Sequence, residues 1–280
     1  MKRAAIVIVA LVLGVVALGY PAISNYLAER NGSQAVQAYD ETVDRLSPDE
    51  VDALWAAAEE YNQSLTGQPV HDPFIAGSGM AMAENYRQVL NVGGVMGYVE
   101  IPKIGVSLPI YHGTSEAVLR KGAGHLEGST LPIGGESRHA VLTGHTGLTH
   151  AKLFTDLVEL AEGDLVYIHV LGKVLAYEVD QLKVIEPQNT EDLKRVDGKD
   201  LVTLLTCTPY GVNSHRLLVR GVRVDYDPQA RASIEPVAGS AVDLLALRAG
   251  AITGGVMLAL TLVVVLVRRR GSRGTPRGAR

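Results

Sequence analysis

DLVTLLTCTPYGVNSHRLLVRG, residues 200–221, contains two apolar runs separated by a loop rich in turn-forming residues. This order predicts a strand, a loop and a second strand. The first run ends at Cys207, the only cysteine of the chain, and the second begins at Arg216. A lone cysteine at a strand end, with a cation close by, is typical of an activated thiolate. The alternative is a buried cysteine that acts as a small apolar side chain.

The chain around this stretch, from Gly97 to Tyr226, predicts a mainly β domain. Its apolar runs are short, rich in Val, Ile, Leu and Tyr, and separated by turns, which is typical of a barrel or a sandwich. Short helices are expected at Ser115–Leu119 and Ala151–Leu160, and another before the strands at Met82–Leu90. The predicted strands are Gly97–Ile101, Ser107–Tyr111, His139–Thr143, Asp164–His169, Val174–Ile185, Leu201–Thr206 and Arg216–Tyr226.

The region before the barrel divides into helices and a loop. Residues 33–65 predict two helices, and Ser47-Pro48-Asp49-Glu50 begins the second with an N-cap serine, a first-turn proline and a glutamate three residues after the cap. These helices either form a stalk or pack on the barrel, and the sequence does not distinguish between the two arrangements. Residues 67–79, GQPVHDPFIAGSG, predict a loop, which by composition alone is typical of a linker.

Two long apolar segments lie near the ends of the chain. Residues 4–28 and 249–267 contain no charged residue. A helix needs about 20 apolar residues to cross the hydrocarbon core, so both segments are expected to be transmembrane helices. The alternative for the first is a cleaved signal peptide, for which Ala17-Leu18-Gly19 offers a weak small-residue site.

Charge gives the expected orientation. Basic residues flank the outer end of each segment, so both termini are expected in the cytoplasm and the middle outside the cell. The two ends hold 8 of the 26 basic residues, and all 30 acidic residues lie between them, so the central part has 18 basic residues and a net charge of −12. An acidic exported domain argues against nucleic acid as a partner. A single cysteine cannot form an internal disulfide there, which favours a functional thiol.

A cysteine nucleophile needs a proton acceptor or a cation beside it. His145, in AVLTGHTGLTH, is the best placed of the eight histidines, because it follows an apolar run and stands between glycines. His125, His150 and His215 remain candidates, since spacing alone does not choose among them.

Two arginines are candidates for the cation beside Cys207. Arg216 and Arg220 share one face of the predicted strand HRLLVRG, because side chains alternate between the faces of a strand. Arg216 is preferred, since it lies nearer the loop from which Cys207 emerges. An arginine there would lower the pKa of the thiol and donate hydrogen bonds to an oxyanion.

Three motifs together resemble the sortases, membrane-anchored cysteine transpeptidases of Gram-positive bacteria: TGHTG at 143–147, LLTCTP at 204–209 and HRLLVRG at 215–221. The resemblance is strongest to the class C, pilus-assembling branch and covers about residues 34–226. The helical region, the His-Asp-Pro-Phe loop at 71–74 and the second apolar segment with its basic tail point to that branch. The resemblance implies a closed β-barrel of about seven or eight strands with short helices, an N-terminal helical region and two transmembrane helices.

The resemblance also implies the roles of individual residues. The loop of residues 67–79 becomes a lid, with Asp72 near the arginine or the thiol and Phe74 covering the thiol. Thr206 is expected in the substrate groove, and His125 returns to a structural role. The implied catalytic residues are Cys207 as nucleophile, His145 as proton donor and acceptor, and Arg216 as the group that stabilises the oxyanion and the substrate.

The reaction implied is a two-step acyl transfer. A Leu-Pro-X-Thr-Gly-type sorting signal is cleaved through a thioester on Cys207, and the lysine amine of a second pilin takes the acyl group in an isopeptide bond. The expected partners are pilins or surface proteins that bear such signals, the acceptor lysine and the membrane, and no cofactor or metal is expected. The alternatives are a sortase that anchors proteins to peptidoglycan and a non-catalytic exported β-domain.

These inferences divide the chain into seven segments. The domain that carries the chemistry is expected outside the cell, at the membrane of a Gram-positive bacterium. The predicted segments are residues 1–28 (signal anchor), 29–66 (helical region), 67–79 (lid), 80–230 (catalytic barrel), 231–248 (linker), 249–267 (transmembrane helix) and 268–280 (basic cytoplasmic tail).

Overall fold

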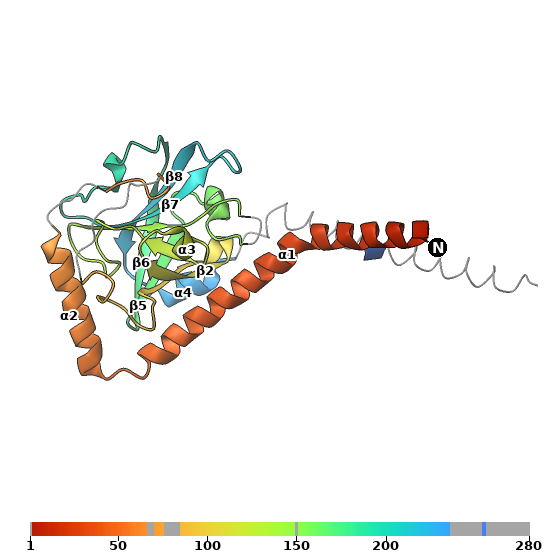
Figure 1. Cartoon of the computed structure of the whole chain (residues 1–280). Helices are drawn as coiled ribbons and strands as arrows, with labels where there is room; N and C mark the ends of the chain where they lie inside the picture. Colours follow the sequence, from red (N-terminus) through yellow and green to blue (C-terminus); the bar gives the residue numbers. More distant parts are fainter. Residues whose placement is uncertain (1, 66–69, 76–84, 149–150, 236–253, 256–280) are drawn as a thin grey trace, which may run out of the picture. The chain divides into compact units, whose positions relative to one another are not determined.

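The computed structural model describes residues 2–65, 70–75, 85–148, 151–235 and 254–255. The chain forms two compact units, one of residues 1–25 and 239–280 and the other of residues 26–238. The second unit contains the β-barrel and the predicted catalytic residues (Figure 1).

A closed β-barrel forms the centre of the second unit. Among the described residues, eight strands follow one another around it in the order β1-β2-β3-β4-β7-β8-β6-β5. The mainly β barrel predicted from the sequence is therefore confirmed. The strands are β1 (Gly97–Ile101), β2 (Val106–His112), β3 (Ala123–His125), β4 (Arg138–Thr143), β5 (Leu165–Val170), β6 (Lys173–Ile185), β7 (Asp200–Thr208) and β8 (His215–Val224).

Strand β3 is absent from the sequence-based prediction. Its three residues, Ala123, Gly124 and His125, are too few and include no β-branched side chain, so no strand pattern marks them. The strand pairs in parallel with β2 and antiparallel with β4. A short helix, α3 (Glu116–Leu119), packs closely over it, because a Cβ built on Gly124 would lie 2.9 Å from Cδ2 of Leu119.

Two helices precede the barrel. α1 spans Lys2–Val43 and α2 spans Pro48–Ser64. The predicted capping box is present at the start of α2. The hydroxyl of Ser47 accepts a hydrogen bond from the Glu50 N–H, and the Glu50 carboxylate accepts one from the Ser47 N–H.

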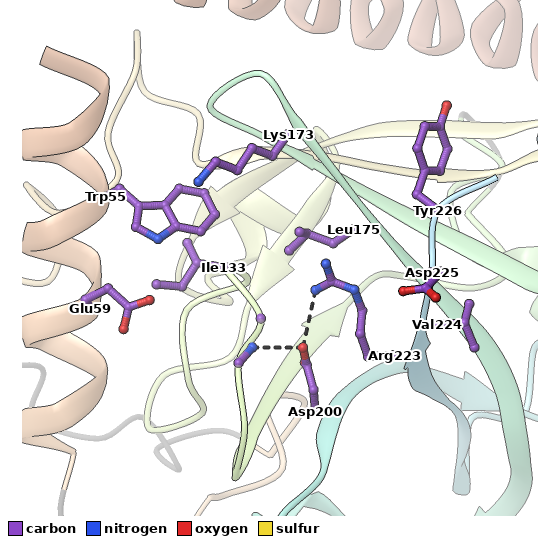
Figure 2. Close-up of a pocket in the computed structure, with 12 residues that line it drawn as sticks. Trp55, Glu59, Ile133, Lys173, Leu175, Asp200, Arg223, Val224, Asp225 and Tyr226 are labelled. Carbon is purple, nitrogen blue, oxygen red and sulfur yellow. Dashed lines mark hydrogen bonds and ion pairs between the residues drawn. The ribbon is translucent and has the colours of Figure 1, made fainter. Parts of the chain in front are cut away.

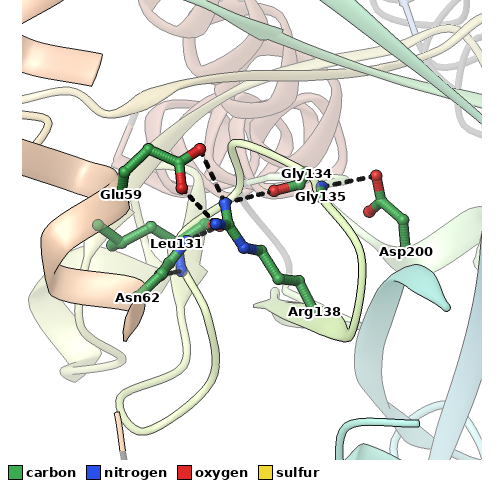
Figure 3. Close-up of polar contacts among 7 residues, drawn as sticks. All are labelled: Glu59, Asn62, Leu131, Gly134, Gly135, Arg138 and Asp200. Carbon is green, nitrogen blue, oxygen red and sulfur yellow. Dashed lines mark hydrogen bonds and ion pairs between the residues drawn. The ribbon is translucent and has the colours of Figure 1, made fainter. Parts of the chain in front are cut away.

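Both helices contact the barrel, which answers the question that the sequence left open. The side-chain oxygen of Asn62 on α2 accepts a hydrogen bond of 2.7 Å from the Leu131 N–H. Glu59, one turn earlier, forms an ion pair with both terminal nitrogens of Arg138 (Figure 3). Tyr39 of α1 is 3% exposed and belongs to the main hydrophobic core. The helical region therefore packs on the barrel rather than forming a stalk.

The shorter helices agree only in part with the predictions. α3 lies where a helix was predicted at Ser115–Leu119. The helix predicted at Ala151–Leu160 is shorter and of 3₁₀ type, Thr155–Glu159, because Leu153 has a left-handed φ of 44° that no helix accommodates. Residues 85–90 form turns, so the helix predicted at Met82–Leu90 is wrong over the part that the structure describes. The remaining short helices are η1 (Pro102–Ile104), η3 (Glu191–Leu193) and α4 (Pro228–Ser233).

The prediction of two transmembrane helices is not supported by the structure. Within the described ranges, no helix has the length and apolar character needed to cross a membrane. Of the second predicted segment, residues 249–267, only residues 254–255 are described.

Apolar packing divides into two clusters. The larger fills the barrel and extends to α1 and α2. The smaller lies on the side of β7 and β8 that faces away from it and includes Leu205, Leu218 and Val70 from the predicted lid, with Phe74 packed against it. The lid segment is thus attached to the barrel by apolar contacts at both Val70 and Phe74.

Candidate active site

Cys207 lies near the end of β7, directly opposite Arg216 on the neighbouring antiparallel strand β8. Directly paired residues present their side chains on the same face of a sheet. Cys207 is 8% exposed and Arg216 is 5% exposed. The register therefore places the thiol and the guanidinium side by side in a largely desolvated position. Arg220, the other candidate, pairs instead with Asp180.

The buried guanidinium of Arg216 forms an ion pair with Asp72 of the predicted lid. Its Nε donates to Oδ2 of Asp72 at 2.5 Å, and its Nη2 donates to Oδ1 at 3.2 Å. Its Nη1 donates to the carbonyl oxygens of Asn213 and His215 at 3.1 and 3.0 Å. A two-point contact of this kind fixes both side chains, and it uses the donors that face the carboxylate.

Phe74 lies between the arginine and a histidine. Its N–H donates to Oδ1 of Asp72 at 2.7 Å, which stabilises the turn at residues 72–74. The centroid of its ring is 5.1 Å from the guanidinium carbon of Arg216 and 5.5 Å from the ring centroid of His145. The predicted lid segment thus places an aromatic ring in contact with two of the three predicted catalytic side chains.

His145 follows the end of β4, which runs parallel to β7. Thr143 pairs with Leu205 in this ladder, so both strands bring their carboxyl ends to the same edge of the barrel. The Gly144 N–H donates to the Leu205 carbonyl at 3.1 Å, and the Thr206 hydroxyl donates to the Gly144 carbonyl at 2.7 Å. These bonds attach the loop of His145 to the residues that immediately precede Cys207.

Thr206, which was predicted to lie in the substrate groove, is buried next to the loop of His145. The residue is 1% exposed, and its hydroxyl is used by Gly144. Side chains alternate along β7, so Thr206 and Cys207 point to opposite faces. The hydroxyl of Thr206 therefore holds the loop of His145, and its contact with substrate stays a prediction.

Comparison with known proteins identifies the family to which this chain belongs. A sequence model of the sortase domain matches residues 99–224. The solved structure of sortase C-1 from Streptococcus pneumoniae is 49% identical, with a TM-score of 0.66 over 69% of this chain and 100% of that one. This chain belongs to the sortase family. Its members are cysteine transpeptidases, so the chain is an enzyme of that class and the non-catalytic alternative is wrong.

Two further relatives show which branch of the family this sortase resembles. The solved structure of the pilus-related sortase C of group B Streptococcus is 46% identical, with a TM-score of 0.64 over 68% of this chain and 97% of that one. Sortase A of Bacillus anthracis is 26% identical over 216 residues, which cover 77% of this chain and 91% of the relative. The resemblance to class C sortases predicted from the motifs is therefore confirmed. Sortases are typically membrane-associated proteins of Gram-positive bacteria.

The electrostatic environment keeps the thiol of this sortase neutral. The pKa of Cys207 is raised to about 11, mainly by burial; Arg216 lowers this pKa and Asp72 raises it, and both effects are smaller than that of burial. Desolvation disfavours a thiolate, whereas the neighbouring cation favours it. Burial outweighs the nearby cation here, so the neutral thiol of Cys207 is favoured over the reactive thiolate.

The other candidate histidines have different surroundings. His125 is fully buried between the Tyr86 hydroxyl, 2.8 Å from its Nδ1, and the Thr130 carbonyl, 2.9 Å from its Nε2, and burial lowers the pKa of His125 to about 4. His215 is exposed and lies on the strand face opposite Arg216. His150 lies outside the described residues. His145 and His215 both lie at the barrel edge of Cys207, and of these two His145 is the one whose side chain is largely buried, at 16% exposed.

Glu116 of α3 is a site residue that the sequence-based predictions did not include. Its Oε2 lies 3.0 Å from Nε2 of His145. The sequence separation of 29 residues and the lack of a motif left no signal for this contact. Among the residues that the structure describes, no group of three or more His, Cys, Asp or Glu side chains could hold a metal ion.

A separate cavity of about 780 Å³ lies between α2 and the barrel (Figure 2). Trp55 and Lys173 line one side, with the Lys173 ammonium 3.8 Å from the centroid of the indole ring. Arg223 and Asp200 line another side and form an ion pair of 3.3 Å. None of the predicted catalytic residues lines this cavity, so it is distinct from the site at Cys207.

Proposed function

We propose that this sortase joins pilin subunits by cleaving a Leu-Pro-X-Thr-Gly-type signal and transferring the acyl group to a lysine. The observation that carries this proposal is the pairing of Cys207 with Arg216 beside the loop of His145, in a chain whose solved neighbours include a pilus-related sortase C. In this proposal Cys207 is the nucleophile, His145 exchanges protons, and Arg216 stabilises the oxyanion.

The first half-reaction forms a thioester. The sulfur of Cys207 attacks the carbonyl carbon of the signal threonine, and the thiol proton passes to His145. The carbonyl oxygen becomes negative and accepts hydrogen bonds from Arg216, whose charge acts strongly because the position is largely desolvated. The C–N bond to glycine then breaks, and the leaving amine takes its proton from His145.

The second half-reaction forms the isopeptide bond. A lysine amine of a second pilin attacks the thioester carbon and gives its proton to His145. The C–S bond breaks, and Cys207 recovers a proton. Water competes with the amine for the thioester, so an apolar cover over the site favours polymerisation over hydrolysis. Phe74 is suited to be part of such a cover, because its ring already contacts His145 and the Arg216 guanidinium.

The Asp72–Arg216 ion pair supports an inhibitory lid. The Asp72 carboxylate contacts the Nε and Nη2 donors that an oxyanion would need. Substrate therefore competes with Asp72 for the arginine, and the lid segment must move before Arg216 is available. In this proposal Asp72 and Phe74 block the site rather than only selecting the substrate.

The lid gives a pH-dependent prediction for the thiol. In the wild-type chain, alkylation of Cys207 by iodoacetamide is expected to rise with a midpoint near pH 11, because burial raises the pKa of Cys207 to about 11. Replacing Asp72 and Phe74 by alanine removes a negative charge and a cover, so the midpoint is expected to fall and labelling at neutral pH to rise by about tenfold per unit of pKa. Labelling rates are measured by mass spectrometry across the pH range.

Asp180→Ala is the matched control for the lid variant, because Asp180 forms the same kind of two-point contact with Arg220 on β8. This control is expected to leave the labelling midpoint unchanged. The raised pKa of Cys207 also makes the free energy of unfolding depend on pH. The contribution of Cys207 to stability is fully present below pH 9.0, the pKa of the unfolded chain, and is lost as the pH rises through about 11. Equal midpoints for the wild type and the lid variant would show that residues 70–75 are a linker and not a lid.

Ligation of two subunits tests the proposed acceptor. The enzyme is incubated with one pilin that carries a Leu-Pro-X-Thr-Gly-type signal and a second pilin without one. We expect a covalent dimer whose cross-linked peptides show a bond between the signal threonine and a lysine side chain. A thioester that passes its acyl group only to a peptidoglycan-type amine would refute pilin joining and support the wall-anchoring alternative.

The proposal includes attachment to the cell membrane with the barrel outside the cell and both termini in the cytoplasm. Its support is the pair of uncharged segments, residues 4–28 and 249–267, with basic residues at their outer ends. The full chain is expected to stay in the membrane fraction after washing at alkaline pH. Release into the wash would refute this topology.

A further inference from the structure

The imidazole of His145 contacts one carboxylate that belongs neither to the lid nor to the barrel strands. Nε2 of His145 lies 3.0 Å from Oε2 of Glu116, and the His145 side chain is 16% exposed. The other oxygen of Glu116 accepts a hydrogen bond of 2.6 Å from Nε of Arg120. An ionised carboxylate only accepts hydrogen bonds, so Nε2 of His145 carries the proton in this contact.

Glu116 is ionised at neutral pH. The pKa of Glu116 is lowered, mainly by the hydrogen bond from Arg120; desolvation opposes this effect, and the hydrogen bond from His145 lowers the pKa further. With Nε2 protonated towards this carboxylate, Nδ1 is the ring nitrogen left to take and give protons.

Packing fixes the helix that carries Glu116. Leu119 of α3 is 2% exposed and packs over Gly124 of β3, where no larger residue fits. Gly124 pairs with Thr143 on β4, two residues before His145. The helix that carries Glu116 is therefore packed on β3, and His145 follows the adjoining strand β4. The distance between the carboxylate and the imidazole does not depend on the lid.

The lid provides a second ring contact of His145, through Phe74. When the lid moves away for catalysis, that contact is lost, whereas the contact with Glu116 comes from a helix packed on the barrel. We propose that Glu116 is a positioning residue that holds the His145 ring with Nδ1 as the nitrogen that exchanges protons with Cys207, the leaving amine and the acceptor amine. This proposal rests on the proposed transpeptidase function.

In this arrangement Nδ1 of His145 carries every proton that is transferred. In the first half-reaction Nδ1 takes the thiol proton as the C–S bond forms, and it gives that proton to the glycine amine as the C–N bond breaks. In the second, Nδ1 takes a proton from the lysine amine as the new C–N bond forms, and it returns the proton to Cys207 as the C–S bond breaks. The proton on Nε2 stays on the bond to Glu116 throughout.

The test compares Glu116→Gln with Glu162→Gln in the full chain. Glutamine keeps the size of glutamate but loses the charge that favours a proton on Nε2 and stabilises the imidazolium. Glu162 is an exposed glutamate of a loop, so its replacement makes the same change of charge away from the site. Kinetics with a peptide that contains Leu-Pro-X-Thr-Gly are measured in the Asp72→Ala, Phe74→Ala background, so that lid opening does not limit the rate.

We expect kcat to fall by about tenfold in Glu116→Gln, with KM within about twofold, because the orientation of a proton-transfer group affects the chemical step. The effect is smaller than a buried partner would give, since the Glu116 side chain is 58% exposed and solvent weakens its field. Glu162→Gln is expected to match the background enzyme in both constants.

A second readout does not depend on activity. Nitrogen-15 chemical shifts of the His145 ring, assigned by comparison with a His145→Gln chain, report the tautomer directly. We expect the Nε2–H form in the wild type and a mixture of tautomers in Glu116→Gln. An Nδ1–H form in the wild type, or an unchanged kcat in Glu116→Gln, would overturn the proposal. An Nε2–H form in a chain that makes no thioester would support the placement of His145 and refute the proposed function instead.

Discussion

Cys207→Ala is expected to abolish cleavage of a sorting-signal peptide, with a loss of at least about 10³-fold in kcat. The reason is that both half-reactions proceed through a bond to this sulfur, and the chain has no other cysteine. Alanine is small and apolar, and Cys207 is 8% exposed within a strand, so the fold is expected to be retained. Cleavage is followed by chromatography of the peptide products, and folding by circular dichroism.

Thr208→Ala is the matched control for this change, because Thr208 is the next residue of β7 and pairs with His215 rather than with Arg216. It is expected to retain most of the wild-type cleavage. A Cys207→Ala chain that still cleaves the peptide at a comparable rate would show that the nucleophile is elsewhere.

Arg216→Lys is expected to lower kcat for thioester formation by about 10²–10³-fold, the range for loss of one oxyanion donor. Lysine keeps the charge but lacks the planar pair of donors that contacts Asp72 at 2.5 and 3.2 Å and that an oxyanion would use after the lid moves. Arg220→Lys, four residues along β8, is the control, because its partner is the more exposed Asp180. Thioester formation is measured under single-turnover conditions.

A combined variant separates this catalytic role from a structural one. If Arg216 acted only by holding the buried Asp72, the kinetic loss in Arg216→Lys would disappear when the lid is also released by Asp72→Ala and Phe74→Ala. We expect the loss to remain, because the oxyanion needs the arginine whether or not the lid is present. Recovery of wild-type rates in the combined variant would contradict the catalytic role.

The position of Arg216 could be predicted because it depends on local rules. Alternation along the strand puts Arg216 and Arg220 on one face, and Arg216 is preferred because it lies nearer the loop after Cys207; the observed register pairs Cys207 with Arg216. The mainly β fold and the capped start of α2 were predictable for the same reason, since apolar alternation and capping residues lie close together in the sequence.

The remaining parts of the site depend on contacts between distant segments. The ion pair of Asp72 with Arg216 joins residues 144 positions apart, and only the resemblance to the sortases suggested it. β3 has too few residues to show a pattern, yet it supports α3 and so the position of Glu116. Spacing also could not choose between His145 and His125, because the burial of His125 against Tyr86 is a tertiary contact.

The central claim is that Cys207 carries the acyl group, and intact mass spectrometry of the enzyme tests it most directly. The full chain is mixed with a peptide that contains Leu-Pro-X-Thr-Gly, quenched in acid and weighed. We expect an adduct equal to the peptide up to its threonine, located on Cys207 by fragmentation and removed by hydroxylamine, as a thioester is. Peptide cleavage without any adduct on Cys207, or an adduct on another residue, would contradict the claim.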